Sequence, residues 1–178
     1  MHLKKKILSL LLAAAVLLGS APAALAASSA SDSVIEEVIR ATGIMVGDES
    51  GDMNLNNTVT RAEYAKMLVS ASTYKDKVSG VSNSSPFSDV PYTHWAAGYI
   101  KTAVAQGWLT GYLDGSYKPD NTVTLEEAAT GALKQLGYTT EDFSGSYPYG
   151  QLALYESLGL DANITASQGT AMTRRNMM

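Results

Sequence analysis

The sequence contains no cysteine and only two histidines. Without cysteine the protein has no disulfide framework, no thiol nucleophile and no thiolate metal site, so its stability must come from packing. His2 belongs to a basic N-terminal segment, and His94 has no serine or cysteine at a spacing that indicates a catalytic pair. We therefore predict that the protein is not an enzyme and needs no cofactor.

Basic residues are outnumbered: 13 lysines and arginines stand against 17 acidic residues, which leaves a formal charge of −4. Nucleic acids and anionic lipids are bound through basic patches. An acidic chain is therefore a poor candidate for either partner.

A long apolar run occurs at the N-terminus and not in the rest of the chain. Lys4, Lys5 and Lys6 precede the apolar residues 7–18, and a small-x-small cleavage site follows at residues 24–26. This is the pattern of a secretory signal peptide, and the run is short for a membrane span. We expect an exported protein that starts at Ala27 and has no membrane partner after cleavage.

One stretch of the chain occurs twice without a gap. Residues 107–127 read GWLTGYLDGSYKPDNTVTLEE, and residues 43–63, sixty-four positions earlier, read GIMVGDESGDMNLNNTVTRAE. A third, weaker copy begins at Gly159 and ends in MTRRN at 172–176. A repeat of this kind determines the architecture.

Each copy is predicted to be a helix, a glycine-rich loop and a capped helix. Thr60 with Glu63, and Thr124 with Glu127, have the spacing of a capping box. Apolar residues at helical spacing predict helices over residues 34–41, from Thr60 to about Ser72, from about Thr93 to Gln106, over residues 125–136 and around residues 152–158. Only five residues follow Thr173, so the third capped helix is expected to be incomplete.

A single repeat buries too little surface to be stable alone. We therefore predict an all-α fold in which tandem helix-loop-helix repeats pack as a pseudo-threefold bundle with grooves between neighbours. The predicted parts are a signal peptide (1–26), repeat 1 (27–75), a linker (76–85), repeat 2 (86–137) and a truncated repeat 3 (138–178). The incomplete third repeat is expected to leave apolar surface exposed and to favour self-association.

The second repeat resembles a known module. Its segments Phe87-Ser88-Asp89-Val90-Pro91, His94-Trp95-Ala96 and 107–124 are similar to one full module of the S-layer homology family, and Thr60-Arg61-Ala62-Glu63 resembles that family's Thr-Arg-Ala-Glu motif. The resemblance implies modules in threes that anchor proteins to a bacterial cell wall or S-layer. It also implies a ligand, a secondary cell-wall polysaccharide that is often pyruvylated, in grooves between modules.

The resemblance further implies which residues bind this glycan. They are Arg61, Arg174, Trp95, Asp114 and Gly115; to these we add Gly111, where the lack of a side chain lets the backbone approach a ligand closely, and Asp89. Chemically, an arginine fork and the free amides of a helix's first turn both suit a carboxylate, and a tryptophan ring suits a sugar. Because Leu125 replaces the arginine in the second repeat, we expect the Arg61 groove to be the best site and the Arg174 groove to be second.

Simpler roles stand beside these. Trp95 lies on a predicted apolar stripe and by default packs in a core, although a mixed role is also open to it because tryptophan is often only partly buried. Asp114-Gly115 is most simply a turn, and Asp89 can cap the helix that follows it. The alternative function is a calcium-dependent, dockerin-like protein-binding repeat, because residues 48–54 place oxygen side chains at the first positions of a calcium loop. Val59 stands where that loop requires a bidentate acid, so we predict no metal site.

Overall fold

The computed structural model describes residues 31–78 and 87–178. The predicted signal peptide and most of the predicted linker lie outside these ranges. The helices are α1 (Asp32–Thr42), α2 (Arg61–Ser70), α3 (Ala97–Ala105), α4 (Leu125–Gln135) and α5 (Tyr149–Ser157), with short 3₁₀ turns at Lys75–Lys77, Thr140–Asp142 and Arg175–Met177. Pairing of extended backbone in the described ranges is confined to isolated bridges. The all-α prediction is therefore confirmed.

The capped helices begin where the sequence predicts. At the start of α2 the Glu63 amide donates to Thr60 Oγ1 (3.2 Å), and the Thr60 amide donates to Glu63 Oε2 (2.9 Å). At the start of α4 the Thr124 amide donates to Glu127 Oε2 (3.1 Å). Each glutamate thus satisfies an amide that the helix itself leaves without an acceptor.

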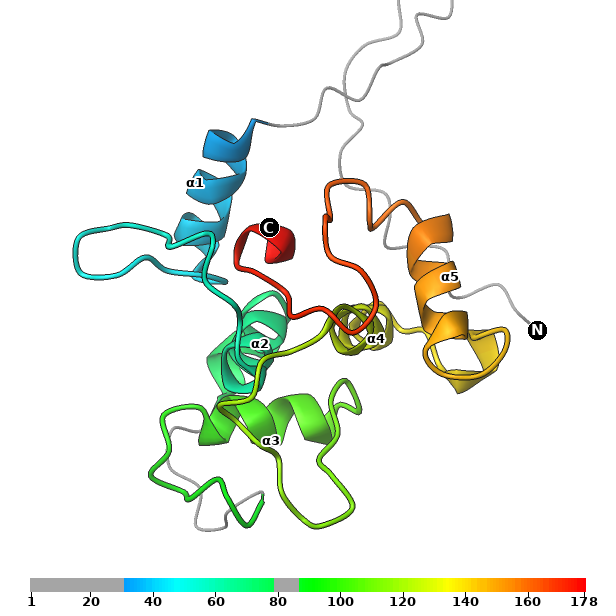
Figure 1. Cartoon of the computed structure of the whole chain (residues 1–178). Helices are drawn as coiled ribbons and strands as arrows, with labels where there is room; N and C mark the ends of the chain where they lie inside the picture. Colours follow the sequence, from blue (N-terminus) through cyan, green and yellow to red (C-terminus); the bar gives the residue numbers. More distant parts are fainter. Residues whose placement is uncertain (1–30, 79–86) are drawn as a thin grey trace, which may run out of the picture. The chain divides into compact units, whose positions relative to one another are not determined.

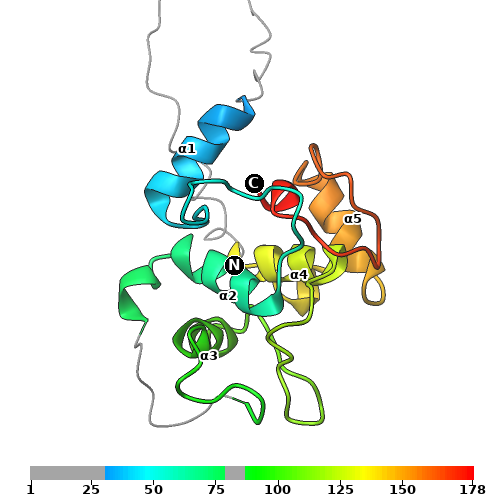
Figure 2. The same ribbon diagram turned by 60° about the vertical axis from the view of Figure 1, so that its left-hand side comes forward.

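Helices α2 and α4 lie next to each other, with α3 packed against α2 and α5 against α4 (Figures 1 and 2). Tyr64 of α2 is buried and donates its hydroxyl to the carbonyl of Ala128 on α4 (2.6 Å). Gly131 permits this approach, because a Cβ atom there would lie 2.9 Å from the Tyr64 ring. Burial raises the pKa of Tyr64, so the hydroxyl remains a donor at physiological pH.

Three backbone hydrogen bonds close a ring among the three copies of the repeat. The Val59 amide donates to Met172 O (2.9 Å), Met172 to Val123 O (2.9 Å) and Val123 to Val59 O (3.0 Å). Each of these residues directly precedes the threonine of its repeat, and all three are buried. The ring ties together segments that are far apart in the sequence.

The start of α3 differs from the prediction. Residues 91–96 form turns, in which the His94 amide donates to Pro91 O (2.8 Å), and α3 begins only at Ala97. Ile100 and Ala103 are buried as expected, but Trp95 lies before the helix and is 56% exposed. The expectation that Trp95 packs in a core is wrong, because the turns take it off the helical stripe.

An apolar-lined cavity of about 490 Å³ lies beside the C-terminal turn. Its walls include Met67 and Leu68 of α2, Ala128 of α4, and Met177. Met67, Leu68 and Ala128 are themselves buried, and the exposed apolar surface and the self-association both stay predictions. None of the helices in the described part of the chain is long and apolar enough to cross a membrane.

Candidate functional site

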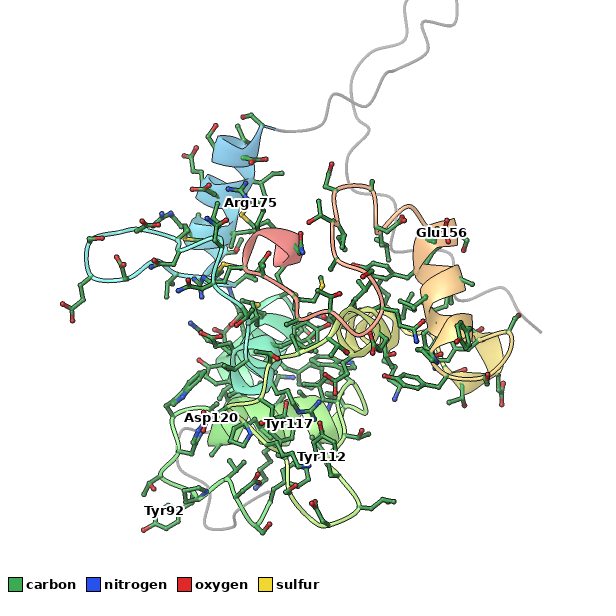
Figure 3. All side chains as sticks on the ribbon, viewed as in Figure 1. Tyr92, Tyr112, Tyr117, Asp120, Glu156 and Arg175 are labelled. Atoms are coloured by element: carbon green, nitrogen blue, oxygen red, sulfur yellow. The ribbon has the colours of Figure 1, made fainter. Side chains whose placement is uncertain are left out.

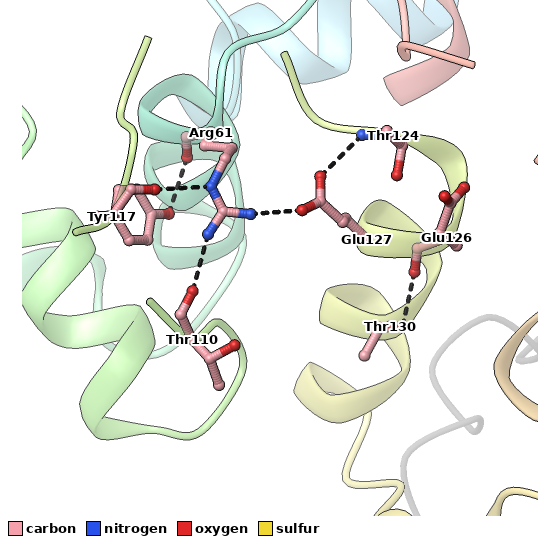
Figure 4. A network of polar contacts seen from close by, with 7 residues as sticks. All are labelled: Arg61, Thr110, Tyr117, Thr124, Glu126, Glu127 and Thr130. Carbon is pink, nitrogen blue, oxygen red and sulfur yellow. Dashed lines mark hydrogen bonds and ion pairs between the residues drawn. The ribbon is translucent and has the colours of Figure 1, made fainter. Parts of the chain in front are cut away.

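Arg61 is the first residue of α2, and its guanidinium group lies in a wall between two repeats (Figure 4). Nε donates to Tyr117 O (2.9 Å), a second nitrogen to Thr110 O (2.8 Å), and the third forms an ion pair with Glu127 (2.8 Å). The side chain is only 7% exposed. Arg61 therefore joins the start of α2 to the loop and the capped helix of the next repeat.

Two tyrosine rings flank this arginine. Arg61 Cζ lies 4.7 Å from the centroid of the Tyr117 ring and 5.0 Å from that of Tyr112. Both tyrosines come from the loop that follows α3 (Figure 3). The rings and acceptors enclose the cation and hold its orientation.

Arg174 repeats the arrangement one repeat further on. It donates through Nε to Met53 O (2.7 Å) and through a second nitrogen to Val46 O (2.6 Å), and its third nitrogen lies 3.8 Å from Glu63. These three partners precede the three partners of Arg61 by sixty-four positions, the offset of the sequence repeat. The two arginines, each directly after a threonine of its repeat, therefore occupy equivalent places in two neighbouring contacts.

Each arginine lines a groove. The Arg61 groove, of about 260 Å³, is bounded by Arg61, residues 108–110, Glu127, Thr130, Lys134, Thr140, Phe143, Tyr147 and Gln151. The Arg174 groove, of about 480 Å³, is bounded by Arg174, residues 44–48, Asn54, Asn57, Thr58, Thr60, Glu63, Lys66, Met67 and Trp95. The structure thus places Arg61, Arg174 and Trp95, three of the predicted ligand-binding residues, in groove walls.

An exposed aromatic side chain stands at each groove. Trp95 and Tyr147 are each 56% exposed, and each lies two residues before the first residue of its helix, α3 and α5 respectively. Burial, together with the negative charges of Glu126 and Glu127, raises the pKa of Tyr147, which keeps its hydroxyl protonated. A partly exposed ring in a groove offers an apolar face to a ligand.

The first-turn amides of the capped helix are not free. The Arg61 amide donates to Asn121 O (2.8 Å), the Ala62 amide to Pro119 O (3.0 Å) and the Glu63 amide to Thr60 Oγ1. In the third copy Arg174 and Arg175 donate in the same way to Asn57 O and Leu55 O. The expectation that these amides receive an anion is wrong, because carbonyl groups of a neighbouring repeat use them.

The remaining predicted residues hold the loop that follows α3. Asp89 accepts hydrogen bonds from the amides of Tyr117 (2.8 Å) and Lys118 (2.7 Å), and Asp114 accepts from the amide and hydroxyl of Ser116. Although burial acts to raise the pKa of Asp89, these amides lower it. Gly111 is packed against Phe87, whose ring a Cβ atom there would meet at 2.2 Å.

The loop that resembles a calcium site, residues 48–54, is closed by its own hydrogen bonds. Asp48 Oδ1 accepts from the Ser50 amide and hydroxyl and from the Asp52 amide, and Oδ2 accepts from Asn54 Nδ2. The Ser50 hydroxyl bond is the main cause that lowers the pKa of Asp48 to about 2. No group of three or more acidic or histidine side chains is arranged to hold a metal ion within residues 31–78 and 87–178.

The second copy has no arginine at the equivalent position. Leu125 stands there, and its amide donates to Thr170 O (3.1 Å), so the backbone contact survives without the guanidinium group. The described residues therefore contain two arginine contacts of this kind, one made by Arg61 and one by Arg174.

Sequence reasoning missed several groove residues. Thr110 and Val46 act through backbone carbonyls, which leave no signature in a sequence. Lys134 and Lys66 were overlooked, although each lies on the groove side of a capped helix. The alignment of the repeats could have indicated them. Lys66 aligns with Thr130, which lies one helical turn before Lys134, so both lysines belong to the same face of the capped helix.

Residues 86–129 match the model of the S-layer homology domain. The chain is 30% identical to the middle cell wall protein of Brevibacillus brevis over 94% of its length, and 32% identical to a surface layer protein of Brevibacillus choshinensis over 75%. It is also 34% identical to a cellulosome-anchoring protein of Acetivibrio thermocellus over 51%. The chain spans only 17%, 13% and 20% of these relatives.

Proposed function

The chain carries an S-layer homology domain at residues 86–129, and from this premise we propose that it anchors non-covalently to a bacterial cell wall. Its ligand in this proposal is an acidic, pyruvylated secondary cell-wall polysaccharide. The sites are the Arg61 groove and the Arg174 groove. The observation that carries the proposal is that both grooves are built from equivalent residues of different repeats and that each has an exposed aromatic ring.

The proposal includes three repeats packed around a pseudo-threefold axis. The closed ring of bonds among Val59, Val123 and Met172 supports it, because cyclic bonding of equivalent residues is what threefold packing produces. The equivalent contacts of Arg61 and Arg174 support it independently. In this arrangement the arginine of repeat 1 contacts repeat 2, and the arginine of repeat 3 contacts repeat 1.

A polysaccharide suits the chemistry of these grooves. Trp95 and Tyr147 present ring faces on which a sugar can stack, while threonine and asparagine side chains nearby offer hydrogen bonds to hydroxyl groups. The Arg174 groove is the larger of the two, at about 480 Å³ against about 260 Å³.

The relatives indicate where the protein works. They are named as cell wall, surface layer and anchoring proteins, and this chain is accordingly an exported protein of the bacterial cell surface. The S-layer homology domain is an anchoring module without a catalytic role. That the chain itself has no enzymatic activity, and that it joins an S-layer, remain predictions.

Binding to isolated wall material tests the proposal. The purified protein is expected to sediment with walls that retain their secondary polysaccharide and to remain in solution when the polysaccharide has been extracted. Trp95→Ala and Tyr147→Ala are each expected to weaken binding. Tyr92→Ala is the matched control, because Tyr92 is equally exposed, at 56%, but lies outside both grooves. Binding that is indifferent to extraction would contradict the proposal.

A further inference from the structure

The groove arginines donate mainly to protein acceptors, Arg61 through all three of its nitrogens and Arg174 through two of three. All three guanidinium nitrogens of Arg61 donate to protein acceptors, and the side chain is almost fully buried. A ligand carboxylate that approached Arg61 would also meet the carboxylate of Glu127, which lies 2.8 Å from the same group. The ligand carboxylate and that of Glu127 would then lie close together and repel each other. The arginine is therefore better suited to holding the groove wall than to binding an anion.

The backbone offers no substitute at these places. The first-turn amides of α2 and of the third copy donate to carbonyl groups of a neighbouring repeat or to a capping threonine. These amides are therefore not available as donors to an anion. An anion in either groove needs another donor.

One further cation lines each groove. Lys134 of α4 borders the Arg61 groove, and Lys66 of α2 borders the Arg174 groove. Both side chains are half-buried, and neither ammonium group forms an ion pair with a residue that the structure describes. A half-buried ammonium group without a counter-ion favours an anionic ligand.

The two lysines reach their grooves from different positions. Lys66 aligns with Thr130, and Lys134 aligns with Ser70. The two positions are four residues apart and therefore share one face of the helix. Each groove thus has one lysine, although the repeat does not place it at the same position.

The grooves differ in their balance of charge. Among the residues that line the Arg61 groove, Arg61 and Lys134 stand against Glu127, which leaves one positive charge; Glu126 acts on Tyr147 from outside this lining. The Arg174 groove is lined by Arg174 and Lys66 against Glu63 and Asp48, which cancel. The first groove is therefore the better site for an anion.

We propose that Lys134 and Lys66 bind the carboxylate groups of the wall polysaccharide, whereas Arg61 and Arg174 position the groove walls, and that the Arg61 groove is the tighter of the two anion sites. This inference rests on the proposed function. It assigns the charge recognition to residues outside the repeated motif. Sugar rings stack on Tyr147 and Trp95, and the lysines select the acidic form of the polymer.

Calorimetric titration with two polysaccharides tests the assignment. One is the pyruvylated polymer, and the other is the same polymer after mild acid has removed its ketals. Lys134→Gln is expected to weaken binding of the pyruvylated polymer about ten-fold, the effect of one lost charge-assisted hydrogen bond. Lys66→Gln is expected to have a smaller effect, and neither change is expected to alter binding of the depyruvylated polymer.

Two controls accompany these variants. Lys75→Gln removes the same charge from an exposed turn outside both grooves and is expected to bind like the parent. Lys134→Arg restores a cation and is expected to recover most of the affinity. Far-UV circular dichroism verifies that each variant retains the helical content of the parent.

The outcomes separate the two proposals. If the parent binds the pyruvylated polymer and both glutamine variants bind it equally well, the lysine assignment is wrong and the proposed function stands. If the parent binds neither polymer, the proposed function itself fails. A second readout needs no substitution: after ¹³C-dimethylation of the lysines, the pyruvylated polymer is expected to shift the signals of Lys134 and Lys66 and to leave that of Lys75 in place.

Discussion

Replacement of Arg61 by leucine tests whether this arginine holds two repeats together. Leucine is chosen because Leu125 occupies the equivalent position in the second copy. The change removes an ion pair with Glu127 and two hydrogen bonds to backbone carbonyl groups. Glu127 would keep its bond to the Thr124 amide but lose its counter-ion.

The expected loss of stability follows from the burial of this pair. Breaking a buried ion pair by removing one partner costs about 3–5 kcal/mol. Glu127 is 25% exposed, so water can partly solvate its unpaired charge. We therefore take the lower end of this range, about 3 kcal/mol. For a domain of this size that free energy corresponds to a fall in Tm of roughly 6–12 °C.

Arg174 provides an internal comparison. Its side chain and that of Glu63 are 13% and 35% exposed, and the nearest nitrogen-to-oxygen distance is 3.8 Å. We therefore expect Arg174→Leu to cost about 1–2 kcal/mol, mainly through its two backbone hydrogen bonds. Urea denaturation followed by circular dichroism measures both variants. If Arg61→Leu unfolds within about 0.5 kcal/mol of the parent, or if Arg174→Leu costs more, the account of the arginine contacts is refuted.

Two further predictions concern the loops. Gly111→Ala is expected to destabilise the protein by about 1–3 kcal/mol, because its Cβ atom would overlap the Phe87 ring. In a Phe87→Ala background most of this cost is expected to disappear. If denaturant titrations show the same cost in both backgrounds, the overlap is not its cause. The carboxyl group of Asp48 is expected to titrate near pH 2 in carbon-detected NMR, since hydrogen bonds from the Ser50 side chain and other donors lower its pKa from 3.8 to about 2. Because the pKa is lowered on folding, the stabilisation from this carboxylate is fully present above pH 3.8 and is lost as the pH falls toward 2. Ser50→Ala is expected to raise the midpoint, and a midpoint near 4 in the parent would contradict the bonding of this loop.

Much of the fold was predictable because its determinants are local or repeated. Thr60 with Glu63 has a capping-box spacing, and the structure forms both of the expected hydrogen bonds. The offset of sixty-four residues also relates the acceptors of Arg61 to those of Arg174, so the equivalence of the two grooves follows from the sequence repeat.

The site was less predictable, for physical reasons. Trp95 follows the spacing of the α3 stripe, but the turns after Pro91 place it outside the helix and expose it. Arg61 matches a ligand-binding motif, yet two of its nitrogens donate to backbone carbonyl groups of another repeat. Any residue type can supply such a carbonyl group, so the sequence does not reveal these acceptors. Lys134 belongs to no motif, and its place in a groove follows from the packing of the repeats.

The most direct test of wall binding through these grooves is a two-dimensional NMR titration of the purified protein with isolated pyruvylated wall polysaccharide. The perturbed amides are expected to cluster at residues 108–110 and 44–48 and at the positions next to Tyr147 and Trp95, and the Arg61 groove is expected to saturate first. Perturbations confined to the exposed turn around Asp114 or to the apolar cavity beside Met177 would contradict wall binding through these grooves, and so would the absence of any perturbation.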